Sequence, residues 1–264
     1  MSLDLKGIHK TFTTAGGHRQ HVLRGVDLCV EPGEFVSMIG HSGCGKSTLL
    51  NIAGGLLRPD TGTVASDGVA VTAPGPDRAM VFQNYSLLPR LSMVDNVRVA
   101  VRAARPGRAS SRSDEVAERY LTAVGLWEHR DKKPAQVSGG MKQRAAVARA
   151  FAVEPRVLLL DEPFAAVDAL TRARLQSQLV ELWQSESETE IVLMVTHGID
   201  EAILLSDRIV VMANPPQPSV MDIITTDLPR PRDRVSIIDD PHFRVVQERL
   251  LGLLLIEDKE PVAV

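Results

Sequence analysis

Residues 40–48 combine three glycines, three hydroxyl side chains and one lysine, and this combination is suited to holding phosphate groups. Glycines let backbone N–H groups approach an anion closely, and a helix that begins after the loop directs its positive end at the same charge. We expect Lys46 to reach the β- and γ-phosphates of a nucleotide and the Ser47 hydroxyl to ligate Mg²⁺. The predicted nucleotide-binding residues of this loop are Gly40, His41, Ser42, Gly43, Cys44, Gly45, Lys46, Ser47 and Thr48.

The segments around this loop supply the context that a phosphate-binding loop requires. The apolar run 35–39 before it is typical of a buried strand, and residues 49–53 after it are typical of a helix. Strand, glycine-rich loop and helix in this order distinguish the motif from a chance glycine-rich turn.

A second apolar run, residues 157–160, ends in two acids, Asp161 and Glu162. In a protein with a phosphate-binding loop, Asp161 is expected to hold Mg²⁺ through water. Glu162 is then placed to act as the general base toward the attacking water. The alternative is that the pair only caps the following segment, and the complete phosphate loop upstream favours catalysis.

Ser138, Gly139 and Gly140 precede another stretch with helical spacing. We expect Ser138 to be the N-cap of this helix, whose first turn is open enough to contact a phosphate. One chain with one phosphate loop does not need a second anion-binding helix start, whereas two chains that face each other do.

Taken together, these motifs resemble the ATP-binding cassette (ABC) ATPases, and the resemblance extends over nearly the whole chain. It implies that Phe12 stacks on adenine, that Gln83 senses the γ-phosphate and Mg²⁺, and that His197 contacts the γ-phosphate. A lone histidine after an apolar strand is the structural alternative for His197. The implied catalytic residues are Lys46, Glu162 and His197, and the implied Mg²⁺ ligands are Ser47, Gln83 and Asp161. The implied contacts to ATP also include Phe12, Gln83, Ser138, Gly139, Gly140 and Asp168.

Some positions depart from the common pattern of this family. Val137 stands where leucine is usual, Met141 where glutamine is usual, and Gly198 where aspartate is common. The loop 165–168 reads Ala-Ala-Val-Asp, where a glycine or serine and a leucine are more frequent. None of these changes removes a group that touches nucleotide, so we expect an active ATPase.

Several further stretches resemble the ATPase subunits of bacterial importers for nitrate, bicarbonate, cyanate, sulfonate and taurine. They include 75–78, 82–89, 138–144, 199–202 and 228–234. The sequences of 40–45, 84–89 and 131–134 are most similar to those of the nitrate branch. The resemblance implies a second ATPase cassette, transmembrane permease subunits, an indirect link to a solute-binding protein, and a location on the cytoplasmic face of the inner membrane. The segment from Gln83 to Val97 would grip the permease; a buried core loop is the alternative.

The resemblance also implies an α/β fold of the ABC ATPase (P-loop NTPase) type. This fold has a RecA-like parallel-sheet core, an antiparallel β subdomain and an inserted α-helical subdomain. We expect a single ABC ATPase domain over 1–264. Its parts are about 1–84 and 150–213 for the core and β subdomain, about 85–149 for the helical subdomain, and about 214–264 for a proline-rich segment and C-terminal helix.

The local patterns predict individual elements. Alternating positions and turn residues at 15–17 and 31–33 predict antiparallel strands in the first thirty residues, with more strand and turn over 62–76. Continuous apolar runs at 157–160 and 191–195 indicate strands of a parallel sheet, separated by an amphipathic helix over 169–184. Helices are also predicted over 113–124, with Ser113 as N-cap, and over 243–255.

Composition narrows the classes of protein. A net charge of −3 gives no sign of a nucleic-acid-binding surface. Only two cysteines occur, one of them in the phosphate loop, which favours a reducing compartment. No run approaches the roughly 20 apolar residues needed to cross a bilayer. We interpret the arginines at 102, 105, 108 and 112 as part of a solvated loop, with a phosphate or lipid patch as the alternative.

Three rival functions are less consistent with these features. A soluble, non-transport ABC ATPase would carry a coiled-coil insertion or a second cassette. A catalytically dead cassette conflicts with the presence of Lys46, Glu162 and His197. An exporter motor conflicts with the proline- and arginine-containing stretch near 228–234.

Overall fold

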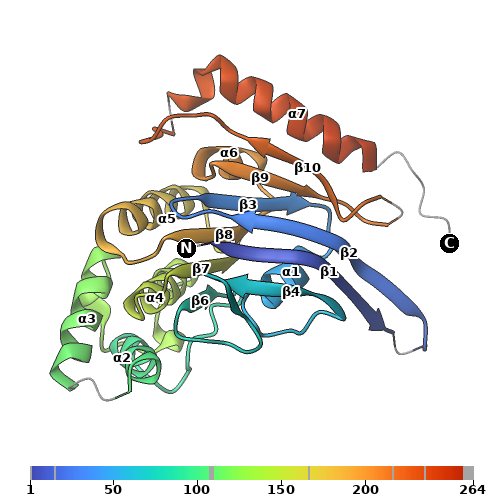
Figure 1. Cartoon of the computed structure of the whole chain (residues 1–264). Coiled ribbons are helices and arrows are strands. Elements are labelled where there is room, and N and C mark those ends of the chain that lie inside the picture. Colours follow the sequence, from blue (N-terminus) through green and yellow to red (C-terminus); the bar gives the residue numbers. More distant parts are fainter. Residues whose placement is uncertain are drawn as a thin grey trace. The chain divides into compact units, whose positions relative to one another are not determined.

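The computed structural model describes residues 2–14, 16–106, 110–165, 167–215, 217–234 and 236–257. The chain divides into two compact units, Met1–Pro74 together with Ile191–Val264, and Gly75–Glu190. We call them unit 1 and unit 2. Both contain parallel strands and helices, which agrees with the predicted α/β class (Figure 1).

Unit 1 begins with an antiparallel sheet, as the alternating sequence predicted. Leu3 and Leu5 of its first strand face Val30 and Leu28 of the second, and all four side chains are buried. Burial alternates along the strands because successive side chains point to opposite faces of a sheet. The strands run in the order β2-β1-β4-β5, with bounds β1 Leu3–Thr13, β2 Arg19–Val30, β4 Thr61–Ser66 and β5 Val69–Ala70.

A second sheet in unit 1 contains parallel strands. β3 pairs in parallel with both β8 and β9, and β10 pairs antiparallel with β9. Every residue of β3 and β8 is buried, so the prediction of interior strands from apolar runs is confirmed at these positions. The bounds are β3 Phe35–Gly40, β8 Ile191–Val195, β9 Arg208–Met212 and β10 Val220–Thr225. Helix α1 (Lys46–Ala53) follows β3, and helix α6 (Ile199–Leu205) follows β8.

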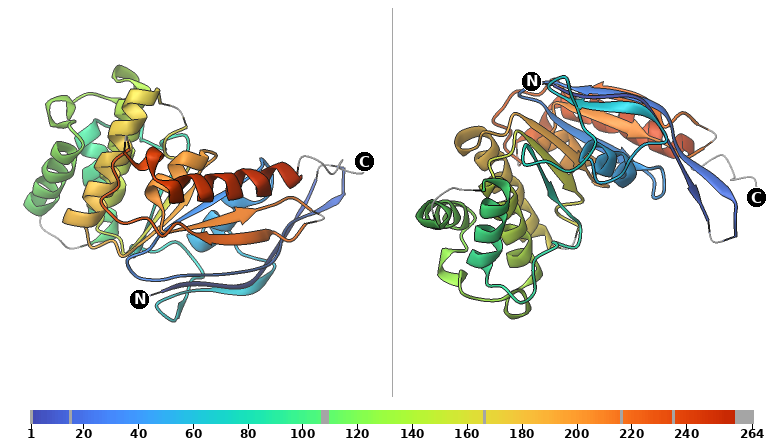
Figure 2. Two further views of the ribbon diagram at one scale, coloured as in Figure 1. Left: turned by 90° about the horizontal axis from the view of Figure 1, so that it is seen from above. Right: turned by 60° about the horizontal axis from the view of Figure 1, so that its bottom comes forward.

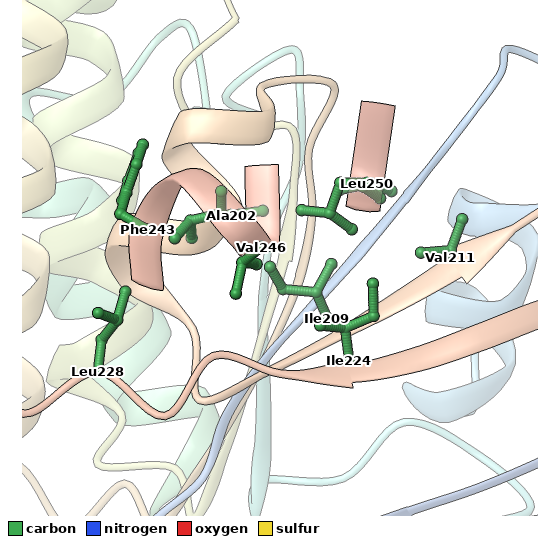
Figure 3. Close-up of a cluster of buried hydrophobic side chains, with 10 residues drawn as sticks. Ala202, Ile209, Val211, Ile224, Leu228, Phe243, Val246 and Leu250 are labelled. Carbon is green, nitrogen blue, oxygen red and sulfur yellow. The ribbon is translucent and has the colours of Figure 1, made fainter. Parts of the chain in front are cut away.

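The C-terminal helix α7 (Pro241–Glu257) covers part of unit 1 and follows a short 3₁₀ turn, Ile237–Asp239. Its side chains Phe243, Val246 and Leu250 are buried with residues of α6, β9 and β10 (Figure 3). Burying a side chain of this size stabilises a fold by about 1.5–3 kcal/mol. Figure 2 shows α7, in red, running along β9 and β10. The predicted helix 243–255 is therefore confirmed and slightly longer.

Unit 2 contains two parallel strands, β6 (Arg78–Val81) and β7 (Val157–Asp161), and four longer helices. The helices are α2 Met93–Ala104, α3 Ser110–Ala123, α4 Gly139–Ala152 and α5 Ala169–Glu181. The first three pack on one another (Figure 2). The Tyr120 ring of α3 stacks on Phe151 of α4 at 6.4 Å between centroids. Short 3₁₀ turns occupy Trp127–His129 and Pro134–Gln136.

Two helix boundaries differ from the sequence prediction. Ser113 is not the N-cap of α3, because the helix begins at Ser110; Ser113 is buried and accepts a hydrogen bond from Arg102 Nε at 3.3 Å. Packing against α2 thus uses a hydroxyl that local sequence assigned to capping. The helix predicted over 169–184 ends at Glu181 and continues as a π-helical turn, Leu182–Glu186.

The arginines near 102–112 are only partly a solvated loop. Arg102 lies in α2 and Arg112 in α3, while Arg105 forms an ion pair with Glu154 at 2.6 Å. Arg108 lies outside the described residues. Of the helices that the structure describes, none is long and apolar enough to cross a membrane.

Candidate nucleotide-binding and catalytic site

The phosphate loop of unit 1 is held by its own lysine. Lys46 is the first residue of α1 and is only 5% exposed. Its Nζ donates to the carbonyl oxygens of Gly40 at 2.7 Å and His41 at 2.8 Å, and Cys44 Sγ lies 3.6 Å away. Among the described residues no carboxylate forms an ion pair with this ammonium group. A buried cation is costly unless an anion joins it, so the loop fits a phosphate ligand.

Glycine is required at the crowded turns of this loop. Gly45, the N-cap of α1, has φ +99°, and a Cβ there would lie 2.7 Å from Leu23 Cδ2. The N-cap Gly45 has no side chain with which to cap α1, and a helix start of this kind favours an anionic ligand. The loop geometry therefore supports the anion-binding prediction.

His197 lies at the same edge of the sheet as the phosphate loop. The loop follows β3 and His197 follows β8, and these two strands are parallel neighbours, so both segments leave the carboxyl ends of the strands. His197 is exposed, and the backbone beside it is fixed because Thr196 Oγ1 accepts from Gly198 N at 3.0 Å and bonds the Glu201 carboxyl group.

Phe12, predicted to stack on adenine, lies near the end of β1 and is 41% exposed. The Lys10 ammonium lies 5.7 Å from the centroid of its ring. An aromatic ring exposed on one face is what a stacking surface requires.

The acidic pair and Gln83 meet at one edge of unit 2. Gln83 follows β6 and Glu162 follows β7, and these strands are parallel neighbours. Gln83 Nε2 donates to Glu162 Oε2 at 2.9 Å. Glu162 has φ +47°, a conformation that is uncommon for a residue with a side chain and is typical of functional turns. Asp161 is the last residue of β7 and is half-buried.

The helix starts predicted to contact a second nucleotide are also formed in unit 2. Ser138 is the N-cap of α4 and accepts from Met141 N at 3.3 Å. A Cβ on Gly140 would lie 2.7 Å from Thr171 Cγ2, so this glycine also lets α4 and α5 approach closely. Asp168 caps α5 by accepting from Thr171 N at 3.0 Å, and this bond lowers the pKa of its carboxyl group.

The predicted site residues fall into two groups, one in each unit. Unit 1 contains Phe12, the phosphate loop and His197; unit 2 contains Gln83, the 138–140 turn, Asp161, Glu162 and Asp168. Ser47, Gln83 and Asp161 offer hydroxyl, amide and carboxylate oxygens, which are the donors that Mg²⁺ prefers. Within the described part of the chain, no cluster of three or more His, Cys, Asp or Glu residues forms a ready-made metal cage. Mg²⁺ bound with substrate phosphates needs only one or two carboxylates.

Sequence analysis missed Asn96, which shapes the segment after Gln83. This buried α2 residue accepts from Leu88 N at 2.7 Å and donates to the carbonyl oxygens of Leu88 at 3.2 Å and Ser92 at 2.9 Å. An asparagine four residues after a serine N-cap, on the apolar side of a helix, was the signal that could have found it.

Arg149, near the end of α4, was also missed. It donates to the carbonyl oxygens of Ser86 at 2.6 Å and Tyr85 at 3.1 Å. Because its acceptors are backbone atoms more than sixty residues away, no local signal could have found it. A third unpredicted contact joins the phosphate loop to α7, since His41 Nε2 lies 3.0 Å from Leu254 O.

Comparisons with known proteins agree with this arrangement. Residues 23–165 match the family model described as ABC transporter. The chain is 47% identical over 247 residues to the nitrate import ATP-binding protein NrtD of Synechococcus elongatus, covering 94% of this chain and 89% of that protein. It is 46% identical over 252 residues to the bicarbonate transport ATP-binding protein CmpD of Synechocystis sp., covering 96% and 88%.

The structure is similar to that of the ATP-binding cassette MJ0796, solved as a dimer in a post-hydrolysis state bound to ADP and Pi. The TM-score is 0.75 with 31% sequence identity, over 84% of this chain and 98% of that chain. This chain therefore belongs to the ABC transporter family. It is a nucleotide-binding ATP hydrolase whose activity is coupled to transmembrane transport.

Proposed function

We propose that this chain is the ATP-hydrolysing motor subunit of a bacterial importer, with nitrate as the transported solute. The observation that carries this proposal is its 47% identity to a nitrate import ATP-binding protein over nearly the full length of both chains. A bicarbonate transport relative is almost equally similar, at 46%, so bicarbonate is the main alternative. Sulfonate, taurine and cyanate are the remaining alternatives for the transported solute. The sequences of residues 40–45, 84–89 and 131–134 favour nitrate as the transported solute.

In this proposal each catalytic side chain has a defined task. Lys46 exchanges the carbonyl oxygens that it now contacts for the β- and γ-phosphates of ATP. Glu162 accepts the proton of the attacking water, Gln83 and His197 orient the γ-phosphate, and Phe12 stacks on adenine. Ser47, Gln83 and Asp161 would hold Mg²⁺, which neutralises charge on the phosphates when it is bound.

Two cassettes, identical or related, bind two ATP molecules between them. Ser138, Gly139 and Gly140 of one cassette contact the nucleotide held by the phosphate loop of the other, and Asp168 lies beside the shared site. The dimeric form of the cassette MJ0796 supports this arrangement. Closure by ATP and opening by hydrolysis are the two states of the motor.

The segment from Gln83 to Val97 is the contact to a transmembrane permease. Leu88 is 44% exposed and Pro89 is also exposed, which favours a docking role over a buried core loop. Residues 85–149 act as the helical subdomain in this scheme, between the core segments 1–84 and 150–213, and 214–264 form the tail. The permease would hold the chain at the cytoplasmic face of the inner membrane and link it to a solute-binding protein.

The test is solute uptake by cells that lack this chain. Labelled nitrate is compared with bicarbonate, cyanate and an alkanesulfonate. We expect selective loss of nitrate uptake, restored by the wild-type chain and not by Lys46→Ala. If uptake of a different solute is lost instead, the motor role stands and nitrate is wrong as the transported solute. Uptake of all four solutes at normal rates would overturn the importer proposal.

A further inference from the structure

The turn after Gln83 is held in a strained shape by the far end of helix α4. Tyr85 and Ser86 have φ values of +63° and +46°, in the left-handed region that residues with side chains rarely adopt. Such conformations persist only where the surrounding structure imposes them. Arg149 contacts both residues, through Nη1 to Ser86 O at 2.6 Å and Nη2 to Tyr85 O at 3.1 Å.

The guanidinium group of Arg149 is suited to this task. Its planar fork places two donors at a fixed spacing, so it can bind two consecutive carbonyl oxygens at once, which a lysine ammonium cannot do with the same geometry. Burial lowers the pKa of the Arg149 side chain below its ordinary value. Among the described residues no carboxylate forms an ion pair with it, so its charge is directed at the two carbonyl oxygens.

Two further side chains, Gln83 and Asn96, hold the same segment. Gln83, at its start, donates to the carboxylate of Glu162 at 2.9 Å. Asn96, near its end, binds the backbone N–H and C=O of Leu88. Between these anchors, Leu88 and Pro89 are exposed. The exposed tip therefore has a shape fixed by Gln83, Arg149 and Asn96.

Helix α4 connects this tip to a second place of contact. Its N-cap is Ser138, and Arg149 lies in its last turn. Arg149 is eleven positions after Ser138, which corresponds to about 16 Å along the helix axis. One helix and two hydrogen bonds therefore connect the Ser138 end to the Tyr85–Ser86 turn.

We propose that Arg149 is a positioning residue that couples the signature turn at Ser138 to the permease-binding tip at Leu88 and Pro89. This inference rests on the proposed roles of those two segments. Gln83 links the tip to the nucleotide bound by the same chain, and Arg149 links it to the nucleotide bound by the partner cassette. Arg149 itself touches neither nucleotide nor solute.

The experiment compares Arg149→Lys and Arg149→Gln with wild type in the full chain. Arg144→Lys is the matched control, because Arg144 lies on the same helix and also donates to a backbone carbonyl, that of Val124 at 3.1 Å. For both Arg149 variants we expect kcat and KM for ATP of the purified chain to stay within about twofold of wild type, because the residue is outside the reacting groups. Solute uptake in cells should fall about tenfold, as expected from the loss of charged hydrogen bonds.

Hydrogen exchange of the same purified chains tests the clamp without reference to transport. The amides of Leu88 and Leu91 should exchange about tenfold faster in the Arg149 variants and at wild-type rates in Arg144→Lys. Unchanged exchange at these amides overturns the proposal. Loss of ATP turnover in parallel with uptake also overturns it, since this is the signature of a damaged fold. If the wild-type chain restores uptake of no tested solute, the importer function fails, and exchange alone decides whether the clamp exists.

Discussion

Two loops of this molecule are fastened in the same chemical way but over very different distances along the chain. The phosphate loop follows buried strand β3, and Lys46 donates to the carbonyl oxygens of Gly40 and His41, six and five residues away. The segment after Gln83 follows β6, and Arg149 donates to the carbonyl oxygens of Tyr85 and Ser86, 64 and 63 residues away. In each case a cationic side chain, buried for Lys46 and half-buried for Arg149, satisfies backbone carbonyl groups of the turn.

The two cations differ in what they can do next. Lysine carries a compact charge on a flexible stem, so Lys46 can leave its carbonyl acceptors when a phosphate arrives. Arginine offers a rigid fork, so Arg149 holds one shape. The first loop is thus built to exchange partners and the second to transmit position. Four further changes test this distinction, from the largest effect to the smallest.

Glu162→Gln should reduce ATP turnover by roughly 10²–10⁴-fold, because it removes the general base. The amide can still accept a hydrogen bond from Gln83, so nucleotide binding should remain. Turnover is measured by phosphate release and binding by equilibrium dialysis. Glu190→Gln, which affects a half-buried carboxylate paired with Arg156, is the control. Equal turnover in Glu162→Gln and wild type would remove Glu162 from the mechanism.

Lys46→Ala should lower turnover by roughly 10²–10³-fold, because a charge placed to stabilise the transferred phosphate is lost. Unlike the arginine variants, it should impair the isolated chain as strongly as it impairs uptake. The measurement is phosphate release by purified chains, with Lys6→Ala, an exposed position on β1, as control. A Lys46→Ala chain that turns over normally but fails in uptake would erase the distinction between the two loops.

Asn96→Ala should destabilise the chain by about 2 kcal/mol, because it removes the acceptor of the Leu88 N–H and the donor to the Ser92 carbonyl oxygen. Asn51→Ala, beside the phosphate loop, is the matched control. Asn51 makes one side-chain bond, to Ser47 O at 2.7 Å, so about 1 kcal/mol or less is expected there. Urea unfolding measures both. A larger loss for Asn51→Ala would show that the phosphate loop is the more dependent on side-chain support.

Asp95, in the first turn of α2, should make the free energy of unfolding depend slightly on pH in the acidic range. Hydrogen bonds from Ser92 and then Arg98 lower the pKa of its carboxyl group below its ordinary value of 3.8. Its stabilising contribution is therefore fully present above about pH 4 and is lost as pH falls through the lowered pKa. Because the side chain is 45% exposed, the effect should be about 0.5 kcal/mol or less.

The corresponding measurement is the difference in melting temperature between wild type and Asp95→Asn. The difference should favour wild type at pH 7 and shrink as the pH drops below about 4. A difference in melting temperature that grows as the pH falls would contradict the predicted direction of the effect.

The elements that sequence analysis predicted well are those whose cause is local. Every residue of β3 and β8 is buried, as the apolar runs at 35–39 and 191–195 indicated. The N-cap at Ser138 was also correct, because capping is decided within four residues. Ser113 failed the same rule, since a tertiary contact with Arg102 uses its hydroxyl and the helix begins three residues earlier.

The same division holds for the candidate site. The phosphate loop could be assigned from sequence because its glycines, lysine and hydroxyls act on one another within nine residues. Sequence analysis did not predict the hydrogen bond between Gln83 and Glu162, which are 79 residues apart, and the parallel pairing of β6 and β7 produces it. Sequence analysis assigned no role to Asn96 or Arg149.

By itself, the sequence determined the family, the phosphate loop and the buried strands, because these depend on residue type at short spacing. Only the tertiary structure decided which backbone carbonyls Arg149 would meet and that His41 would meet the last turns of α7. Backbone acceptors are the same at every residue, so they leave no mark in a sequence. Their partners are chosen by the packing of distant elements, and only folded geometry records that choice.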